Sequence, residues 1–104
     1  MNRDTFTKIV NIHCDQMKAV LTHKAKEYAR DGDRLANFKT AAVINDVSVP
    51  EALWGMATKH LVSVMDLIYG DLENTEAMVD EKVGDLVNYL VLLKAVLQEE
   101  RDGD

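Results

Sequence analysis

The sequence predicts an all-α protein: a helical bundle of three long helices and one short helix, completed by oligomerisation. The chain has one proline and five glycines in 104 residues, and this scarcity favours long helices over a turn-rich β fold. Apolar residues make up 47% of the chain and charged residues 29%, so the chain can bury a core. The length suits one domain, and we predict a single helical domain over 1–104 with an ordered core at about 5–100.

The first long helix is expected from about residue 5 to residue 30. Apolar residues recur there at helical spacing: Phe6, Ile9, Val10, Met17, Val20, Leu21 and Tyr28. The turn signal Asp31-Gly32-Asp33 ends this segment. A short helix is expected next, over about 35–45, with its own apolar residues: Leu35, Phe38, Ala41, Ala42 and Ile44.

The second long helix is expected to begin at Ser48-Val49-Pro50-Glu51. A serine followed three residues later by glutamate is a capping box, and proline suits the first turn of a helix. The helix runs to about Tyr69, where Gly70 is a stop signal. The residues expected to face the core are Leu53, Trp54, Ala57, Leu61, Val64 and Ile68.

The third long helix is expected over about 75–101 and is apolar on several sides. One face carries Val79, Val83, Leu86, Leu90, Leu93 and Leu97. A second stripe reaches Leu92 and Val96, so the helix is either central in a bundle or covered by another subunit. Because a four-helix monomer of this size covers too few of these faces, we predict a homodimer or larger homo-oligomer.

Composition also narrows the possible partners and the compartment. The net charge is −6, with 12 scattered basic residues outnumbered by 18 acidic ones, which argues against a duplex nucleic acid partner. No stretch reaches the ~18 apolar residues that span a bilayer, and the N-terminus lacks a signal peptide pattern, so we expect no membrane partner. The single Cys14 excludes an internal disulfide and fits the cytoplasm, and we expect it to be buried at a helix edge.

Polar residues interrupt the apolar pattern on the first helix. At 100° per residue from Phe6, Lys24 falls at the centre of the apolar stripe, with Tyr28 beside it. A lysine at such a position either reaches solvent at the end of the bundle or meets an acidic partner, so Lys24 is a candidate contact for an anionic ligand.

The same interruption occurs on the last helix. Glu81, Asp85 and Asn88 lie at positions i, i+4 and i+7 and share one face, which continues into the apolar Leu92. We therefore expect the two carboxylates at the mouth of a buried space. The alternative is that both are solvated or paired with lysines.

A third polar stripe lies on the second long helix. Lys59, Ser63 and Asp66 repeat the spacing i, i+4 and i+7, with the small residues Ala52 and Gly55 on or near the stripe. A neighbouring backbone or a ligand has room to approach there. The alternative is an ordinary solvated helix face.

The order of these residues resembles that of a group of small phage-encoded helical proteins. The similarity covers about residues 20–98 and rests on short elements: a Lys/Tyr segment at 24–28, the pair Asn37-Phe38, a Pro50-led helix with Lys59 at its centre, and a final helix segment from Glu81 to Tyr89. If the chain is phage-encoded, its compartment is the host cytoplasm. The helical layout is also similar to the MazG-like all-α nucleoside triphosphate pyrophosphatases.

The MazG-like resemblance implies a magnesium-dependent, oligomeric enzyme. That family binds Mg²⁺ through acidic residues on two helices, with Glu-x-x-Glu on one helix and Glu-x-x-Asp on a later one. Here the final helix has Glu81-x-x-x-Asp85, one residue longer, and Lys59 and Asp66 occupy the helix where paired acids are expected.

Three functional hypotheses follow. In the first, Asp66, Glu81 and Asp85 hold Mg²⁺ through oxygen ligands, and lysines neutralise a phosphate chain that is cleaved. In the second, the chain captures a small nucleotide or a host protein without turnover, and a nucleotide would be contacted by Lys24, Tyr28, Asn37, Lys59 and Asn88. In the third, the chain is an oligomeric structural or regulatory helical protein without a small ligand.

Overall fold

The computed structural model describes residues 1–23 and 32–103 of the chain. Within these residues lie four helices: α1 Arg3–His23, α3 Ala36–Asn45, α4 Val49–Tyr69 and α5 Glu76–Asp102. The predicted all-α class, with three long helices and one short one, is therefore confirmed. The predicted continuation of the first helix to about residue 30 lies outside the described residues.

Local side-chain chemistry sets the ends of α4 and the start of α5. Glu51 donates its backbone N–H to Ser48 Oγ at 3.2 Å, and the Ser48 N–H donates to Glu51 Oε1 at 3.3 Å, which completes the predicted capping box. Gly70 ends α4 with a φ of 84°, a left-handed conformation that glycine adopts without strain. Thr75 caps α5 by accepting the Met78 N–H at 3.1 Å.

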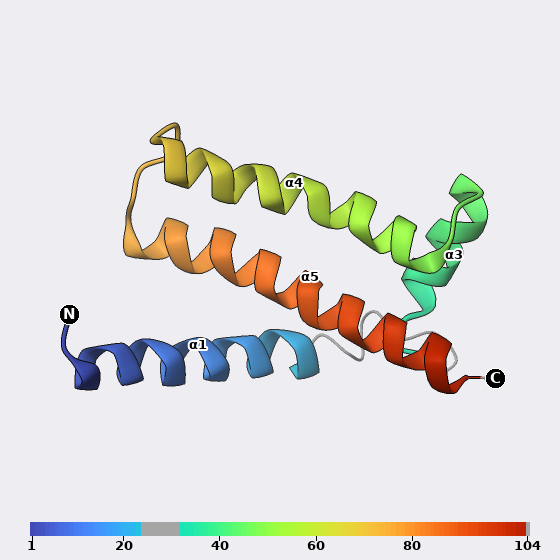
Figure 1. The fold of residues 1–104 in the computed structure, drawn as a ribbon, viewed down its shortest axis with the longest axis horizontal. Coiled ribbons are helices and arrows are strands. Elements are labelled where there is room, and N and C mark those ends of the chain that lie inside the picture. Colours follow the sequence, from blue (N-terminus) through green and yellow to red (C-terminus); the bar gives the residue numbers. More distant parts are fainter. Residues whose placement is uncertain (24–31, 104) are drawn as a thin grey trace.

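The three long helices lie side by side with α5 in the middle (Figure 1). α4 runs antiparallel to α5 and is joined to it by a short turn, so the two form a helical hairpin. α1 runs along the other side of α5, and α3 packs across the beginning of α4. No helix in the described ranges has both the length and the apolar character needed to cross a membrane.

The core is small and lies where α3, the first half of α4 and the second half of α5 meet. The described residues that form it are seven buried apolar side chains: Leu35, Phe38, Ala42, Ala52, Leu53, Ala57 and Val96. The first half of α1 is left largely uncovered, since Phe6 is 59% exposed and Ile12 is 56% exposed. Much of the apolar side-chain surface of this chain is therefore not buried within one copy.

The structure decides which side of α5 and of α4 points inward. On α5, Val96 is buried and Leu92 packs against the core, whereas Leu90 is exposed, so the stripe through Leu92 and Val96 is covered within the chain, as expected for a helix central in a bundle. On α4, Leu53 is buried but Trp54, expected on the same face, is 45% exposed, so the expectation for Trp54 was wrong. These helices carry apolar residues on several sides, and packing decides which side turns inward.

Cys14 also departs from its prediction. Its side chain is exposed on α1, not buried at a helix edge. Among the described helices α1 packs mainly against α5, and most of its side chains are exposed.

An ion-pair cluster ties the start of α3 to the end of α5. Lys39 Nζ lies 2.6 Å from Asp33 Oδ2 and 2.5 Å from Glu99 Oε1. The hydrogen bond from Lys39, with a second one from the Leu35 backbone N–H, holds the pKa of the Asp33 carboxyl below its usual range. The same two carboxylates raise the pKa of Lys39.

The cluster predicts a pH dependence of stability. Folding lowers the pKa of Asp33. The ionised carboxylate therefore stabilises the folded state above its ordinary pKa of about 3.9, and this stabilisation is lost as the pH falls through the pKa of the folded state. Lys39→Met should therefore lower the midpoint of urea denaturation at pH 7, and its difference from wild type should shrink towards pH 2. The matched control is Lys8→Met, an exposed lysine on α1. A Lys39→Met difference that stays constant from pH 7 to pH 2 would contradict the assignment.

Candidate functional site

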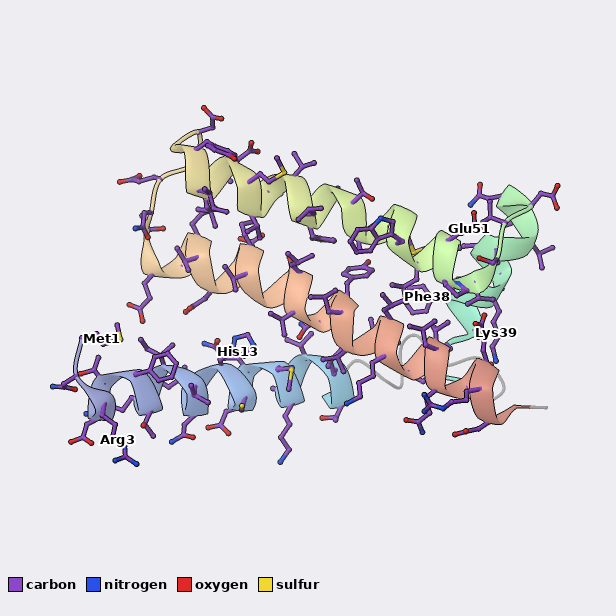
Figure 2. All side chains as sticks on the ribbon, viewed as in Figure 1. Met1, Arg3, His13, Phe38, Lys39 and Glu51 are labelled. Atoms are coloured by element: carbon purple, nitrogen blue, oxygen red, sulfur yellow. The ribbon has the colours of Figure 1, made fainter. Side chains whose placement is uncertain are left out.

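A cavity of about 640 Å³ lies among α3, α4, α5 and the end of α1. Its volume is within the range of small-molecule sites in proteins. Phe38 reaches from α3 towards α5 at one side of this space (Figure 2). The polar residues of the wall come from three helices and the turn before α3: Arg34, Asn37, Thr40, Lys59, His60, Asp85, Asn88 and Tyr89. We refer to this space as the main cavity.

Three aromatic rings from three different helices meet at the wall of the main cavity. The His60 and Tyr89 rings stack with centroids 4.8 Å apart and an interplanar angle of 27°. Phe38 meets Tyr89 edge-on, with centroids 6.5 Å apart at 72°. Such rings offer a flat apolar surface with polar edges, which suits contact with a planar ligand.

The charged groups of the cavity have different surroundings. Asp85 Oδ2 lies 3.6 Å from His60 Nδ1, so the carboxylate and the imidazole face each other across α5 and α4. Lys59 lines the main cavity and forms no ion pair with any described residue. Arg34 adds a second cation to the lining.

Asn88 is the most informative residue of the cavity. It is the one buried polar residue among those described, at 9% exposure, and its Oδ1 has no hydrogen-bond partner among them. Buried polar atoms in native proteins are nearly always paired, and an unpaired one costs about 1–3 kcal/mol. An acceptor in a cavity wall that has no partner among the described residues is a candidate contact for a donor group of a ligand.

A smaller cavity of about 270 Å³ lies between α1 and α5. His13 projects into this region from α1 towards α5 (Figure 2). Glu81 and Asp85 line the opposite side. The two cavities share Val20, Asp85 and Asn88 in their walls, so they adjoin at the middle of α5.

The structure brings together four of the residues singled out from the sequence. Asn37, Lys59, Asp85 and Asn88 all line the main cavity, from α3, α4 and α5. The expectation that Asp85 lies at the mouth of a buried space agrees with this placement. Lys24 and Tyr28 lie outside the described residues.

The other two predicted residues lie elsewhere. Glu81 lines only the smaller cavity, and Lys82 Nζ lies 3.4 Å from its Oε1. Asp66 lines neither cavity and sits in the last turn of α4, where its backbone oxygen accepts the N–H groups of Asp71 and Leu72 at 2.8 and 3.2 Å.

This placement bears on the expected magnesium site. Residues 1–23 and 32–103 contain no group of three His, Cys, Asp or Glu side chains arranged to hold a metal ion. Asp66, Glu81 and Asp85 of one chain therefore do not fit a magnesium site made of all three. The magnesium site stays a prediction.

Four polar lining residues were not predicted as site residues from the sequence: Arg34, Thr40, His60 and Tyr89. The stacking of His60 on Tyr89 depends on the register between α4 and α5, which no local pattern reveals. The spacing of Tyr89 from Asp85 was the available signal, because residues four apart lie on the same face of a helix.

Comparison of the chain with protein-family models, with curated proteins and with solved structures gave no match. The class that the fold and the cavity define is an all-α helical protein with a small-molecule-sized cavity.

Proposed function

We propose that this chain binds a small nucleotide in the main cavity. The observation that carries the proposal is the buried Asn88 Oδ1, an acceptor with no partner among the described residues. The same wall holds Lys59, which forms no ion pair with those residues, and a set of aromatic rings. A nucleotide supplies the complement of each: N–H donors on the base, negative charge on phosphate, and a flat ring.

The proposed roles follow from the chemistry of the wall. Lys59 and Arg34 neutralise the phosphate groups, since both are cations at the lining. The wall formed by Phe38, Tyr89 and His60 packs against the base. The Asn88 carbonyl oxygen accepts a base N–H, which removes the cost of leaving it unpaired.

Turnover of the nucleotide is the second candidate function. Three carboxylates were predicted to serve a Mg²⁺-dependent pyrophosphohydrolase. Two of them, Glu81 and Asp85, line the smaller cavity, which adjoins the main cavity. They are therefore close to where the proposed ligand binds. Asp66 takes no part in this grouping.

The nucleotide proposal predicts a loss of affinity on removing one cation. In isothermal titration with a panel of nucleoside mono-, di- and triphosphates, Lys59→Ala should weaken binding of the best ligand about 10- to 100-fold, the value of a hydrogen bond to a charged group. Lys8→Ala, which removes an exposed lysine far along α1, should bind as wild type does.

Release of pyrophosphate from the same nucleoside triphosphates with Mg²⁺, lost in Asp85→Asn, would support turnover. Binding without release supports a binding protein. No binding of any nucleotide by wild type, or equal weakening by Lys59→Ala and Lys8→Ala, would contradict the proposal.

We also propose that the protein is a homo-oligomer in the cytoplasm. The accessible surface of the single chain is 7657 Å², whereas a compact monomer of its mass exposes about 5,900 Å². The radius of gyration is 15.7 Å, against about 13 Å for a compact domain of this length. The chain is thus more open than a self-sufficient monomer of its size.

A further inference from the structure

The α4–α5 hairpin carries an uncovered apolar face on the side away from the main cavity. On α4 this face comprises Trp54, Thr58, Leu61, Met65 and Ile68. On α5 it comprises Val79, Val83, Leu86, Leu90, Leu93 and Leu97, of which Leu93 is partly buried because it also packs against the core. We call this set of residues the hairpin face.

Helical geometry places both halves of the hairpin face on the same side of the molecule. A helix turns 100° per residue, so Leu90 lies roughly 160° around α5 from Asn88, and Met65 lies roughly 140° around α4 from His60. Asn88 and His60 both face the main cavity. Because α4 and α5 are antiparallel and packed together, the opposite sides of both helices form one continuous surface.

The hairpin face is apolar and open to solvent in a single chain. Trp54, Met65 and Ile68 of α4 are 45%, 43% and 69% exposed, and Leu90 and Leu97 of α5 are 47% and 46% exposed. Thr58 fits such a face because its hydroxyl donates to the Trp54 carbonyl at 2.8 Å and is satisfied within the helix. A surface of this kind usually marks an interface.

We infer that a second copy of this chain covers the hairpin face, so that two hairpins form a four-helix bundle about a twofold axis. The inference rests on the proposed homo-oligomer and not on nucleotide binding. Along both helices the residues of the face alternate at spacings of four and three, the pattern by which helices interlock in four-helix bundles. Each chain brings two antiparallel helices, and a twofold axis supplies the other two.

The size of the exposed surface fits the same partner. The single chain exposes 7657 Å², roughly 1,800 Å² above a compact monomer of its mass. The hairpin face and the uncovered first half of α1 both contribute to this excess. Obligate homodimers bury on the order of 1,000–2,500 Å² per chain. In this arrangement the main cavity of each copy points away from the interface, so a ligand reaches both sites.

The experiment compares two substitutions that place a charge on an exposed apolar position. Leu90→Glu lies at the centre of the hairpin face, and Val43→Glu, on α3, is the control, since Val43 is 81% exposed outside that face. In sedimentation velocity at micromolar concentration without nucleotide, wild type and Val43→Glu should sediment as dimers. Leu90→Glu should sediment as a monomer or require at least 100-fold higher concentration to dimerise.

Trp54 provides a second readout that needs no substitution, because it is the single tryptophan and lies on the hairpin face. Its fluorescence should resist acrylamide quenching in the dimer and become quenchable on dilution as the dimer dissociates. If Leu90→Glu loses its helical circular dichroism signal and is therefore unfolded, this dilution series on wild type decides whether a second copy covers the hairpin face.

A monomeric wild type with freely quenched Trp54 at every concentration would overturn the inference. So would a dimer that survives Leu90→Glu and is broken by Val43→Glu, since the interface would then lie elsewhere. Failure of nucleotide binding changes none of these measurements.

Discussion

Asn88→Leu is expected to raise the melting temperature of the free protein while abolishing its response to nucleotide. The side chain is buried and its Oδ1 lacks a partner among the described residues, so replacing the amide by an apolar group of similar size removes a cost of about 1–3 kcal/mol. For a domain of this length that corresponds to a rise of roughly 4–20 °C. Differential scanning calorimetry, with and without the best-binding nucleotide, measures both effects.

The control for this substitution is Asn11→Leu, an exposed asparagine on α1. Surface changes of this kind usually alter stability by less than about 0.5 kcal/mol, and the ligand-induced rise in melting temperature should persist. A clear fall in the melting temperature of Asn88→Leu would mean that the amide stabilises the free protein. The main support for the binding site would then be removed.

Leu53→Ala is expected to cause the largest loss of stability, about 2–5 kcal/mol. Leu53 is 0% exposed and packs with Leu35, Phe38 and Val96, so its truncation leaves a void among side chains from α3, α4 and α5. The core contains few other large side chains to close that void. Urea denaturation at one fixed protein concentration measures the loss, since the stability of the proposed oligomer would depend on concentration.

Val43→Ala is the comparison for Leu53→Ala, because Val43 is 81% exposed and its truncation should cost less than about 0.5 kcal/mol. Phe38 belongs to the Leu53 cluster and also lines the main cavity, so nucleotide affinity should fall along with stability in Leu53→Ala. A cost below about 1 kcal/mol for Leu53→Ala would show that the stabilising core lies elsewhere.

Part of the candidate site was readable from the sequence because it depends on local interruptions of an apolar pattern. Lys59, Asp85 and Asn88 each stand on a helical stripe with apolar or small neighbours, which places them beside buried space, and the structure shows all three at the main cavity. Asp66 belongs to the same stripe as Lys59 but lies seven residues further, about 10 Å along the helix. Helical spacing predicts on which side of α4 a residue lies. It does not predict how far along α4 the main cavity extends.

The sequence alone determined the all-α class, the capping box at Ser48 and the stop at Gly70, because these depend on residues within a few positions of one another. Only the tertiary structure decided which apolar stripe of α5 points inward. Leu92 and Val96 face α3 and α4, and Leu90 and Leu97 are left exposed, although all four are apolar. The hydrophobic effect rewards burial of either stripe about equally. The choice is therefore made by the surface that α3 and α4 present to α5, which no local pattern encodes.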